Sequence, residues 1–147
     1  MVLDRLLDEA CSGPLHLRQP VIAEMVAEAI QYNALNLRHY SLHAFVVMPN
    51  HVHLLVTPAV LLPKLTKSLK GITAKRANAM LGLTGHAFWQ EESFDHLVRD
   101  DREFSRIERY IENKPVRAGL VSEPREYRWS SAWATGGVAR GRGRPPY

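Results

Sequence analysis

Apolar residues recur along the chain with two different periods, and each period predicts a different kind of element. Residues 2–11 have helical spacing and predict a short amphipathic helix, which leaves no room for a strand before it. Pro20 suits the first turn of a second helix, whose apolar stripe runs to about Asn36. We expect this second helix to serve as scaffold.

The middle of the chain predicts a β-hairpin, then a helix, then a further strand. Residues 40–48 and 51–57 are rich in β-forming apolar side chains and are joined by a Pro-Asn turn signal. Two prolines end the hairpin and open a helix over about residues 63–81. Residues 93–98 then alternate like a strand.

The last helix begins with Asp100 and a second aspartate, whose carboxylates suit its positive end, and Pro115 is expected to break or kink it. Residues 127–131 predict a short packed segment. We therefore expect one domain over residues 1–135, followed by a flexible tail rich in Gly and Arg over residues 136–147. The chain has no internal repeat.

Composition narrows the class of protein. With 147 residues, 46% of them hydrophobic, the chain is long enough for one folded core and too apolar to be disordered. A formal net charge of +4 favours a polyanionic partner, and nucleic acid is the leading candidate. The single cysteine, Cys11, excludes an internal disulfide and a thiolate metal cluster, and no apolar run is long enough to span a bilayer. We expect a soluble, cytoplasmic protein that does not engage membranes.

Two histidines one residue apart, His51 and His53, stand at the head of the second hairpin strand. Alternate side chains of a strand share a face, so both imidazoles project from one face while Val52 and Leu54 line the other. Such a pair forms half of a coordination sphere for a divalent cation. Two half-exposed structural histidines are the alternative, and on spacing alone they are the commoner case. The lone His43 on the preceding strand is interpreted as structural.

Basic side chains follow the helix predicted over residues 63–81. Four lysines opposite its apolar face are candidates for phosphate contacts with DNA, although such a face is often simply solvated: Lys64, Lys67, Lys70 and Lys75. Phe88 and Trp89 come after this helix. Exposed, their rings would stack on unpaired bases; buried, they would be core.

Tyr110 lies beside the buried stripe of the last helix, with Arg106 one turn before it and Lys114 one turn after it. A phenol has an ordinary pKa of about 10, so cations are needed to favour the phenolate; Arg106, Lys114 and Arg117 are candidates. The alternative is a boundary tyrosine that packs its ring and solvates its hydroxyl. Together with the histidine pair and the basic surface, Tyr110 predicts phosphoryl transfer on a nucleic acid through a covalent phosphotyrosine.

Four segments carry a resemblance to a known family: Phe45–Val56, Phe88–Gln90, Phe94–Asp100 and Arg109–Val121. Their residues, order and spacing resemble the REP-associated tyrosine transposases, which belong to the single-tyrosine His-hydrophobe-His (HUH) transposases of bacterial insertion sequences. The resemblance runs from about Tyr40 to Ser131.

The resemblance implies an α+β fold, a ferredoxin-like antiparallel sheet with helices packed on one face. It also implies a Mg²⁺ or Mn²⁺ cofactor, a substrate of single-stranded DNA with REP-like hairpins, and nicking and rejoining through a 5′-phosphotyrosine. His51 and His53 match the metal-binding histidines, and Tyr110 matches the nucleophile. A nucleoid-associated location follows from such a substrate, whereas monomer and homodimer both stay open.

Two features depart from the family pattern. Relatives have Asn or Gln one helical turn after the nucleophile, completing the metal site, and here that position is Lys114. A protonated lysine has no lone pair to donate, so Asn113 or water would substitute, or metal affinity would be weak. Relatives also begin with a strand, which the helix predicted over residues 2–11 would replace. We therefore expect the chain to lack the family's first strand, with a truncated or a misassigned start as the two alternatives.

Three functions are therefore weighed. The first is a metal-dependent transposase and endonuclease acting on single-stranded DNA. The second is a catalytically impaired or domesticated copy that binds structured single-stranded DNA without cutting it. The third is an RNA-binding or interaction domain whose histidines are structural.

Overall fold

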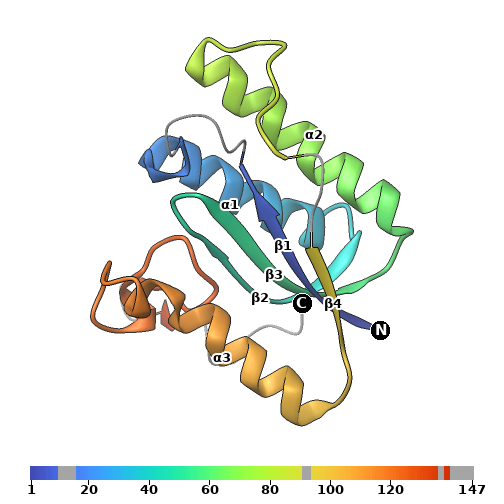
Figure 1. Cartoon of the computed structure of the whole chain (residues 1–147), viewed down its shortest axis with the longest axis vertical. Coiled ribbons are helices and arrows are strands. Elements are labelled where there is room, and N and C mark those ends of the chain that lie inside the picture. The colour runs from blue at the N-terminus through green and yellow to red at the C-terminus, as the bar shows by residue number, and fades with distance from the viewer. Residues whose placement is uncertain (10–15, 91–93, 136–137, 140–147) are drawn as a thin grey trace.

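The computed structural model describes residues 1–9, 16–90, 94–135 and 138–139 (Figure 1). Its fold is α+β with an antiparallel sheet, as predicted, and the described residues form four strands of this sheet and three α-helices. The main elements are β1 (Val2–Asp8), α1 (Pro20–Leu35), β2 (Tyr40–Val47), β3 (His51–Pro58), α2 (Leu62–Leu81), β4 (Phe94–Val98) and α3 (Asp101–Arg117). Two short 3₁₀ turns, η1 (His16–Arg18) and η2 (Pro124–Glu126), flank them, and β5 (Ala134–Thr135) pairs with β6 (Val138–Ala139).

The first element contradicts its prediction, because Val2–Asp8 is a strand and not a helix. The strand order is β2-β3-β1-β4, so β1 lies inside the sheet and pairs with both β3 and β4. Leu3 and Leu7 are four residues apart, a spacing that places them on one face of a helix or of a strand alike. The interior position decides between the two, since it satisfies the backbone of β1 on both sides. The expectation that no strand precedes the first helix is therefore wrong.

The strand β1 contains a buried arginine, a residue type that is usually found on the surface. Arg5 is 4% exposed and shares the face of Leu3 and Leu7. Its guanidinium donates to Asp95 Oδ1 on β4 at 2.8 Å, and to the Thr66 hydroxyl on α2. This charge-assisted pairing offsets the cost of burying the guanidinium, and it ties β1 to β4 and α2.

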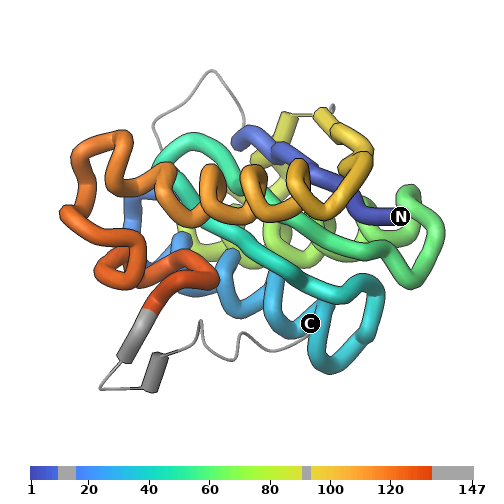
Figure 2. The backbone as a smooth tube through the Cα atoms, turned by 90° about the horizontal axis from the view of Figure 1, so that it is seen from below, coloured from blue at the N-terminus to red at the C-terminus, as the bar shows by residue number. Residues whose placement is uncertain are grey.

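The helices cover both faces of the sheet, which corrects the prediction of helices on one face. The helices α1 and α2 pack on one side, and α3 crosses the other side (Figures 1 and 2). The buried side chains accordingly form two hydrophobic cores, one between the sheet and the helices α1 and α2, and one between the sheet and α3. None of the helices in the described part of the chain is long and apolar enough to cross a membrane.

The larger core lies between the sheet, α1 and α2. Val52, Leu54 and Val56 of β3 contribute to it, each 1% exposed or less. Full burial of one such side chain stabilises the fold by about 1.5–3 kcal/mol. Phe88 and Trp89 belong to this core, at 3% and 7% exposed, and the Trp89 indole donates to the Thr73 hydroxyl at 2.7 Å. Of the two alternatives for these rings, the structure selects the core.

The helix α3 begins as the sequence predicts and continues further than expected. Asp100 caps it by accepting a hydrogen bond from the Glu103 backbone N–H at 2.8 Å. Ile107 and Ile111 bury its inner face against the sheet. Pro115 does not end the helix, which runs to Arg117, because the proline lies so near the C-terminus that only the last turn must adjust.

The segment after α3 is packed, as predicted, and the structure shows that it lies along the edge of β2. Val47 donates to the Trp129 carbonyl at 2.8 Å, and Ser131 donates to the Phe45 carbonyl at 2.9 Å. The Tyr127 hydroxyl donates to the Val47 carbonyl at 2.7 Å. Of the predicted tail, residues 136–137 and 140–147 lie outside the described residues, so its flexibility stays a prediction.

Candidate active site

The histidine pair lies on the face of β3 that α3 covers. His51 and His53 alternate with Val52 and Leu54, which face the larger core, as the period of the strand predicts. His51 is half-buried and His53 is 7% exposed. The two imidazoles therefore occupy a sheltered position at the sheet surface, close to the layer that α3 forms.

Each imidazole uses one ring nitrogen for a contact with an oxygen atom. His51 Nδ1 lies 2.8 Å from Asn50 Oδ1, and His53 Nε2 pairs with Asp4 Oδ1 of β1. The remaining nitrogens, His51 Nε2 and His53 Nδ1, are buried and have no hydrogen-bond partner in the described part of the chain. In metal sites a ligating histidine usually holds an oxygen acceptor with its second nitrogen, so this arrangement fits a divalent cation.

The protonation state of His51 also suits a ligand. Burial, then the charge of Lys114, then His53 lower the pKa of His51 to about 4. At neutral pH its imidazole is therefore uncharged and has a lone pair to donate. Among the described residues no group of three or more His, Cys, Asp or Glu side chains surrounds a possible metal position. The other ligands of a cation here would be water or phosphate oxygens.

Asp4 is the site residue that sequence reasoning missed. It lies on β1, next to β3, where Leu6 is the direct partner of His53 and Asp4 is the partner of Leu55. The aspartate therefore reaches His53 diagonally across the two strands. A polar residue alternating with Leu3 could have marked it, but only if residues 2–8 had been interpreted as a strand.

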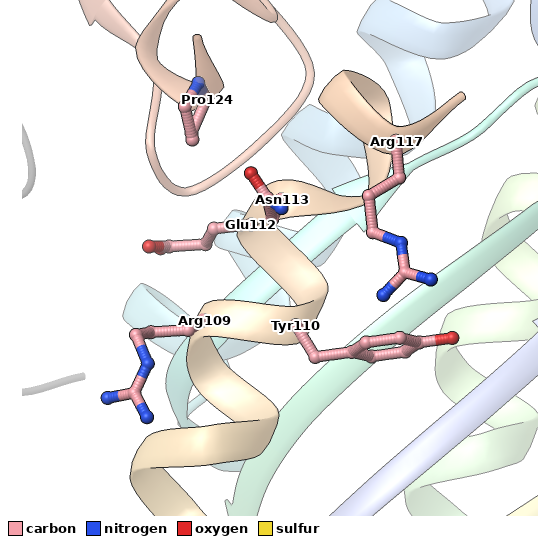
Figure 3. A pocket seen from close by; sticks show the side chains of 6 residues that line it. All are labelled: Arg109, Tyr110, Glu112, Asn113, Arg117 and Pro124. Carbon is pink, nitrogen blue, oxygen red and sulfur yellow. The ribbon is translucent and has the colours of Figure 1, made fainter. Parts of the chain in front are cut away.

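Tyr110 reaches the histidine pair from α3 across the layer boundary. Its ring is 44% exposed, and the ring centroid lies 6.1 Å from that of His53 at an interplanar angle of 80°. Figure 3 shows the phenol extending from α3 over the sheet, with its hydroxyl directed away from Arg109 and Glu112. The structure thus brings together, within one chain, the predicted tyrosine and the predicted histidines.

Two of the three predicted cations accompany Tyr110. Lys114 Nζ lies 3.4 Å from the Tyr110 hydroxyl oxygen and 4.7 Å from the ring centroid. The Arg117 guanidinium lies 5.7 Å from the same centroid. Arg106 is directed elsewhere, with its guanidinium 3.5 Å from Glu103 Oε2. The charge beside the phenol therefore comes from the C-terminal side of Tyr110.

Lys114 and Asn113 take different positions around this site. Lys114 is half-buried and close enough to His51 for its charge to lower the pKa of that histidine. Asn113 points away from the Tyr110 ring (Figure 3), and it lines a pocket between α3 and Pro124 of η2. A metal-ligand role for either position stays a prediction, and the geometry favours the Lys114 position as the one nearer to the histidines.

The lysines of α2 lie in the helical layer on the opposite face of the sheet from α3 (Figure 1). Lys64, Lys67 and Lys75 are exposed. Lys70 instead donates to the Gln90 carbonyl at 2.8 Å, and burial lowers the pKa of its ammonium. The structure does not bring these lysines to the site of Tyr110.

His43 has the contacts of a structural histidine, as interpreted from the sequence. Its Nε2 lies 2.7 Å from the Thr57 hydroxyl of the neighbouring strand, and its ring meets Phe104 of α3 edge-on at 5.1 Å. These contacts fill the space between the sheet and α3 at the end away from the turn that carries Asn50.

The described residues thus form an antiparallel sheet whose His-x-His pair faces a tyrosine of α3, and comparison with known proteins gives the family. The family model of IS200-like transposases matches residues 16–114, so the chain belongs to the IS200-like transposases. The resemblance that the sequence motifs carried is confirmed. No curated protein matches the chain.

Two solved structures share the fold. One is the structure of a REP-associated tyrosine transposase bound to a REP hairpin, which is 18% identical, has a TM-score of 0.64, and is matched over 88% of this chain and 75% of that chain. The other is a protein of Deinococcus radiodurans R1 assigned as a transposase, 23% identical with a TM-score of 0.52, matched over 78% of this chain and 90% of that chain. At these identities the comparison establishes the architecture.

Proposed function

We propose that this chain is a divalent-metal-dependent transposase that cleaves and rejoins hairpin-bearing single-stranded DNA through a 5′-phosphotyrosine at Tyr110. The observation that carries the proposal is the juxtaposition of Tyr110 on α3 with His53 on β3, 6.1 Å between ring centroids, in a member of the IS200-like transposases. A boundary tyrosine that only packed its ring would not need two sheltered imidazole nitrogens beside it.

The chemistry begins with Tyr110. Its hydroxyl loses a proton to solvent water and the oxygen attacks a backbone phosphorus in line, which forms the phosphotyrosine bond as the bond to the 3′-oxygen breaks. The departing 3′-oxygen takes up a proton and leaves as a free hydroxyl. Because the phosphotyrosine replaces one phosphodiester by another, a 3′-hydroxyl can reverse the attack and join strands without ATP.

The side chains around the phenol have separate roles in this proposal. Lys114, 3.4 Å from the Tyr110 hydroxyl oxygen, favours the phenolate by donating to it. Arg117 adds positive charge near the phosphate. His51 and His53 would hold Mg²⁺ or Mn²⁺, which when bound supplies Lewis-acid stabilisation and orientation of the scissile phosphate.

Hairpin DNA is the substrate we favour. The first of the structures that share the fold, a REP-associated tyrosine transposase, is bound to a REP hairpin. The exposed cations Lys64, Lys67 and Lys75 of α2 would contact backbone phosphates only of a DNA that also passes along the α2 layer. Arg106 and Arg117 are better placed, since they share α3 with Tyr110.

A second candidate function is supported by Lys114. Its ammonium lies beside Tyr110 and influences His51, and it has no lone pair for a metal. A site with that charge could hold DNA phosphate without binding a cation. The second candidate is therefore a copy that binds structured single-stranded DNA and does not cut it.

The deciding experiment traps the covalent intermediate. The full chain is mixed with Mn²⁺ and an end-labelled REP-like hairpin with a single-stranded 5′ flank, then denatured and separated by gel electrophoresis. We expect a labelled protein–DNA adduct that Tyr110→Phe abolishes. Tyr32→Phe is the matched control, since Tyr32 is 51% exposed on α1 and outside the site, and it should leave the adduct unchanged.

Each outcome of this experiment separates the candidates. Retarded mobility of the hairpin in a native gel without any adduct would favour the non-cutting copy. An adduct that persists in Tyr110→Phe would refute Tyr110 as the nucleophile. Selective binding of RNA with no response to metal would favour an RNA-binding domain instead.

A further inference from the structure

The helix α2 carries a strongly positive surface on the face of the sheet opposite α3 (Figure 1). Its 20 residues contain five Lys and Arg side chains and no Asp or Glu. The whole chain has a formal net charge of +4, so α2 accounts for the excess and the rest of the chain is close to neutral. The helix α3, by contrast, mixes carboxylates with cations along its length. The positive charge of this protein is therefore concentrated on one helix.

Three exposed positions of α2 lie in one row along the helix. Lys67, Gly71 and Lys75 follow one another at intervals of four residues, so they share a face, and the two lysines are about 12 Å apart along the axis. Lys64, also exposed, comes nearly one turn before Lys67. Among the described residues, none of these lysines forms an ion pair with a carboxylate. Their ammonium groups are therefore available to an external anion.

Two residues of this surface weaken the helix that carries them. Gly71 lies in the interior of α2, where glycine is the least favourable residue after proline. A Cβ at Gly71 would project into open space, with no neighbouring group of the described residues within 4 Å, so packing does not require a glycine there. Lys64 lies in the first turn, where the positive end of the helix dipole disfavours a cation. An anionic ligand that approaches the helix backbone closely at Gly71 accounts for both residues.

The surroundings of this row favour duplex DNA over a single strand. Sites for single strands combine cations with aromatic side chains that stack on unpaired bases. The helix α2 contains no aromatic residue, and Phe88 and Trp89, which follow it, are buried in the core. Cations alone hold backbone phosphates without reading the sequence, and a duplex presents about one phosphate per 1.7 Å of its axis, twice the density of one strand.

An anionic membrane surface is the other polyanion that a basic helix could meet. A helix that lies on a bilayer inserts its apolar side chains between the lipids. The apolar face of α2 is instead turned into the core, with Leu65 at 1% and Leu69 at 2% exposed. The row of lysines thus offers charge without an apolar face beside it, which suits the phosphates of a nucleic-acid duplex.

We infer that Lys64, Lys67, Gly71 and Lys75 form a second nucleic-acid site, which holds the phosphate backbone of double-stranded DNA independently of its sequence. The site is separate from that of Tyr110, because α2 and α3 lie on opposite faces of the sheet (Figure 1). It keeps the chain on duplex DNA while the face under α3 is free for a single strand. The inference does not depend on the cleavage chemistry, since these phosphate contacts need neither Tyr110 nor a metal.

The test uses a fluorescein-labelled blunt duplex of about two helical turns, with no hairpin loop and no unpaired flank. Fluorescence anisotropy with the full chain in EDTA gives the dissociation constant at several NaCl concentrations. Lys67→Gln combined with Lys75→Gln should weaken binding about tenfold at about 50 mM NaCl, and should lower the slope of log K against log[NaCl] by about two. Arg18→Gln combined with Arg102→Gln removes the same charge from exposed positions outside α2, and should weaken binding less than about threefold.

Gly71 allows a variant whose stability and binding should change in opposite directions. Gly71→Leu adds a neutral side chain in open space, so it should raise the urea midpoint of unfolding, followed by circular dichroism. The same side chain should weaken duplex binding about threefold or more, because it holds the helix backbone away from the phosphates. Tyr110→Phe, on the other face of the sheet, should bind the duplex as the unchanged chain does.

The inference is overturned if the duplex does not bind, or if the lysine pair costs no more affinity than the control pair of arginines. Tighter binding of a single strand of the same sequence, dependent on the same lysines, would assign the row to unpaired DNA. Binding of vesicles that contain phosphatidylserine, with none of the duplex, would assign it to a membrane. The adduct with Tyr110 is measured separately, so its absence would refute the cleavage chemistry and leave the duplex site standing.

Discussion

The two faces of the same sheet have opposite character. On the face under α1 and α2, the residues of β1 and β3 are buried and, apart from the ion-paired Arg5, apolar, as with Leu7 at 1% and Leu54 at 0% exposed. On the face under α3, the alternate residues of the same two strands include Asp4, His51 and His53, and one buried ring nitrogen of each histidine has no hydrogen-bond partner among the described residues. Core residues and proposed site residues thus alternate along the same strands, as His51 and His53 do with Val52 and Leu54.

The difference shows how the chain keeps a polar site rigid. Val52, between the two histidines, and Leu3, next to Asp4, are buried in the larger core, so the backbone of β1 and β3 is held in place before any ligand binds. The helix α3 meets the second face with a smaller core built around Ile107 and Ile111, and its exposed side carries Tyr110. Substitutions on the first face should therefore change stability, and those on the second face should change binding and chemistry.

The largest expected effect is on the sealed face. Leu54→Ala should lower the free energy of unfolding by about 2–5 kcal/mol, because it leaves a cavity in a fully buried position. Urea denaturation followed by circular dichroism measures this. Leu97→Ala on β4, where the side chain is 54% exposed, is the control and should cost far less. Equal losses for both would mean that the burial of Leu54 does not set the cost of its truncation.

An intermediate effect is expected for the residue that orients His53. Asp4→Ala removes the oxygen partner of His53 Nε2 and should weaken Mn²⁺ binding about ten- to hundredfold. Isothermal titration calorimetry with Mn²⁺ measures the affinity, and Asp101→Ala on α3 controls for the lost charge. Unchanged Mn²⁺ affinity in Asp4→Ala would show that His53 does not act as a ligand.

The smallest effect is expected at Lys114, which lies beside the two histidines on the face that α3 covers. Lys114→Asn removes a positive charge near His51 and supplies a carbonyl oxygen, so Mn²⁺ affinity should rise about three- to tenfold. The Mn²⁺ concentration that gives half-maximal adduct should fall correspondingly. Lys75→Asn on α2 is the control for net charge. If Lys114→Asn leaves the Mn²⁺ dependence as it was, position 114 is not part of the metal site.

Much of the site was accessible from the sequence because it depends on local periods. The alternation of a strand places His51 and His53 together, and helical spacing places Lys114 beside Tyr110. Arg106 lies one helical turn before Tyr110, as Lys114 lies one turn after it. The Arg106 guanidinium, however, pairs with the Glu103 carboxylate and not with the phenol. Pairings across elements, such as Asp4 with His53 and Glu112 with Ser131, have no local signal at all.

The sequence by itself determined the hairpin, the three long helices from Pro20 onward, the shared face of the two histidines and the family motifs, because each depends on neighbours along the chain. Only the tertiary structure decided that residues 2–8 form an interior strand, since a short apolar run fits either element until two flanking strands pair with it. It also decided that α3 lies on the face opposite α1 and α2. That placement brings Tyr110 to the histidines, and it depends on contacts between residues more than 50 positions apart.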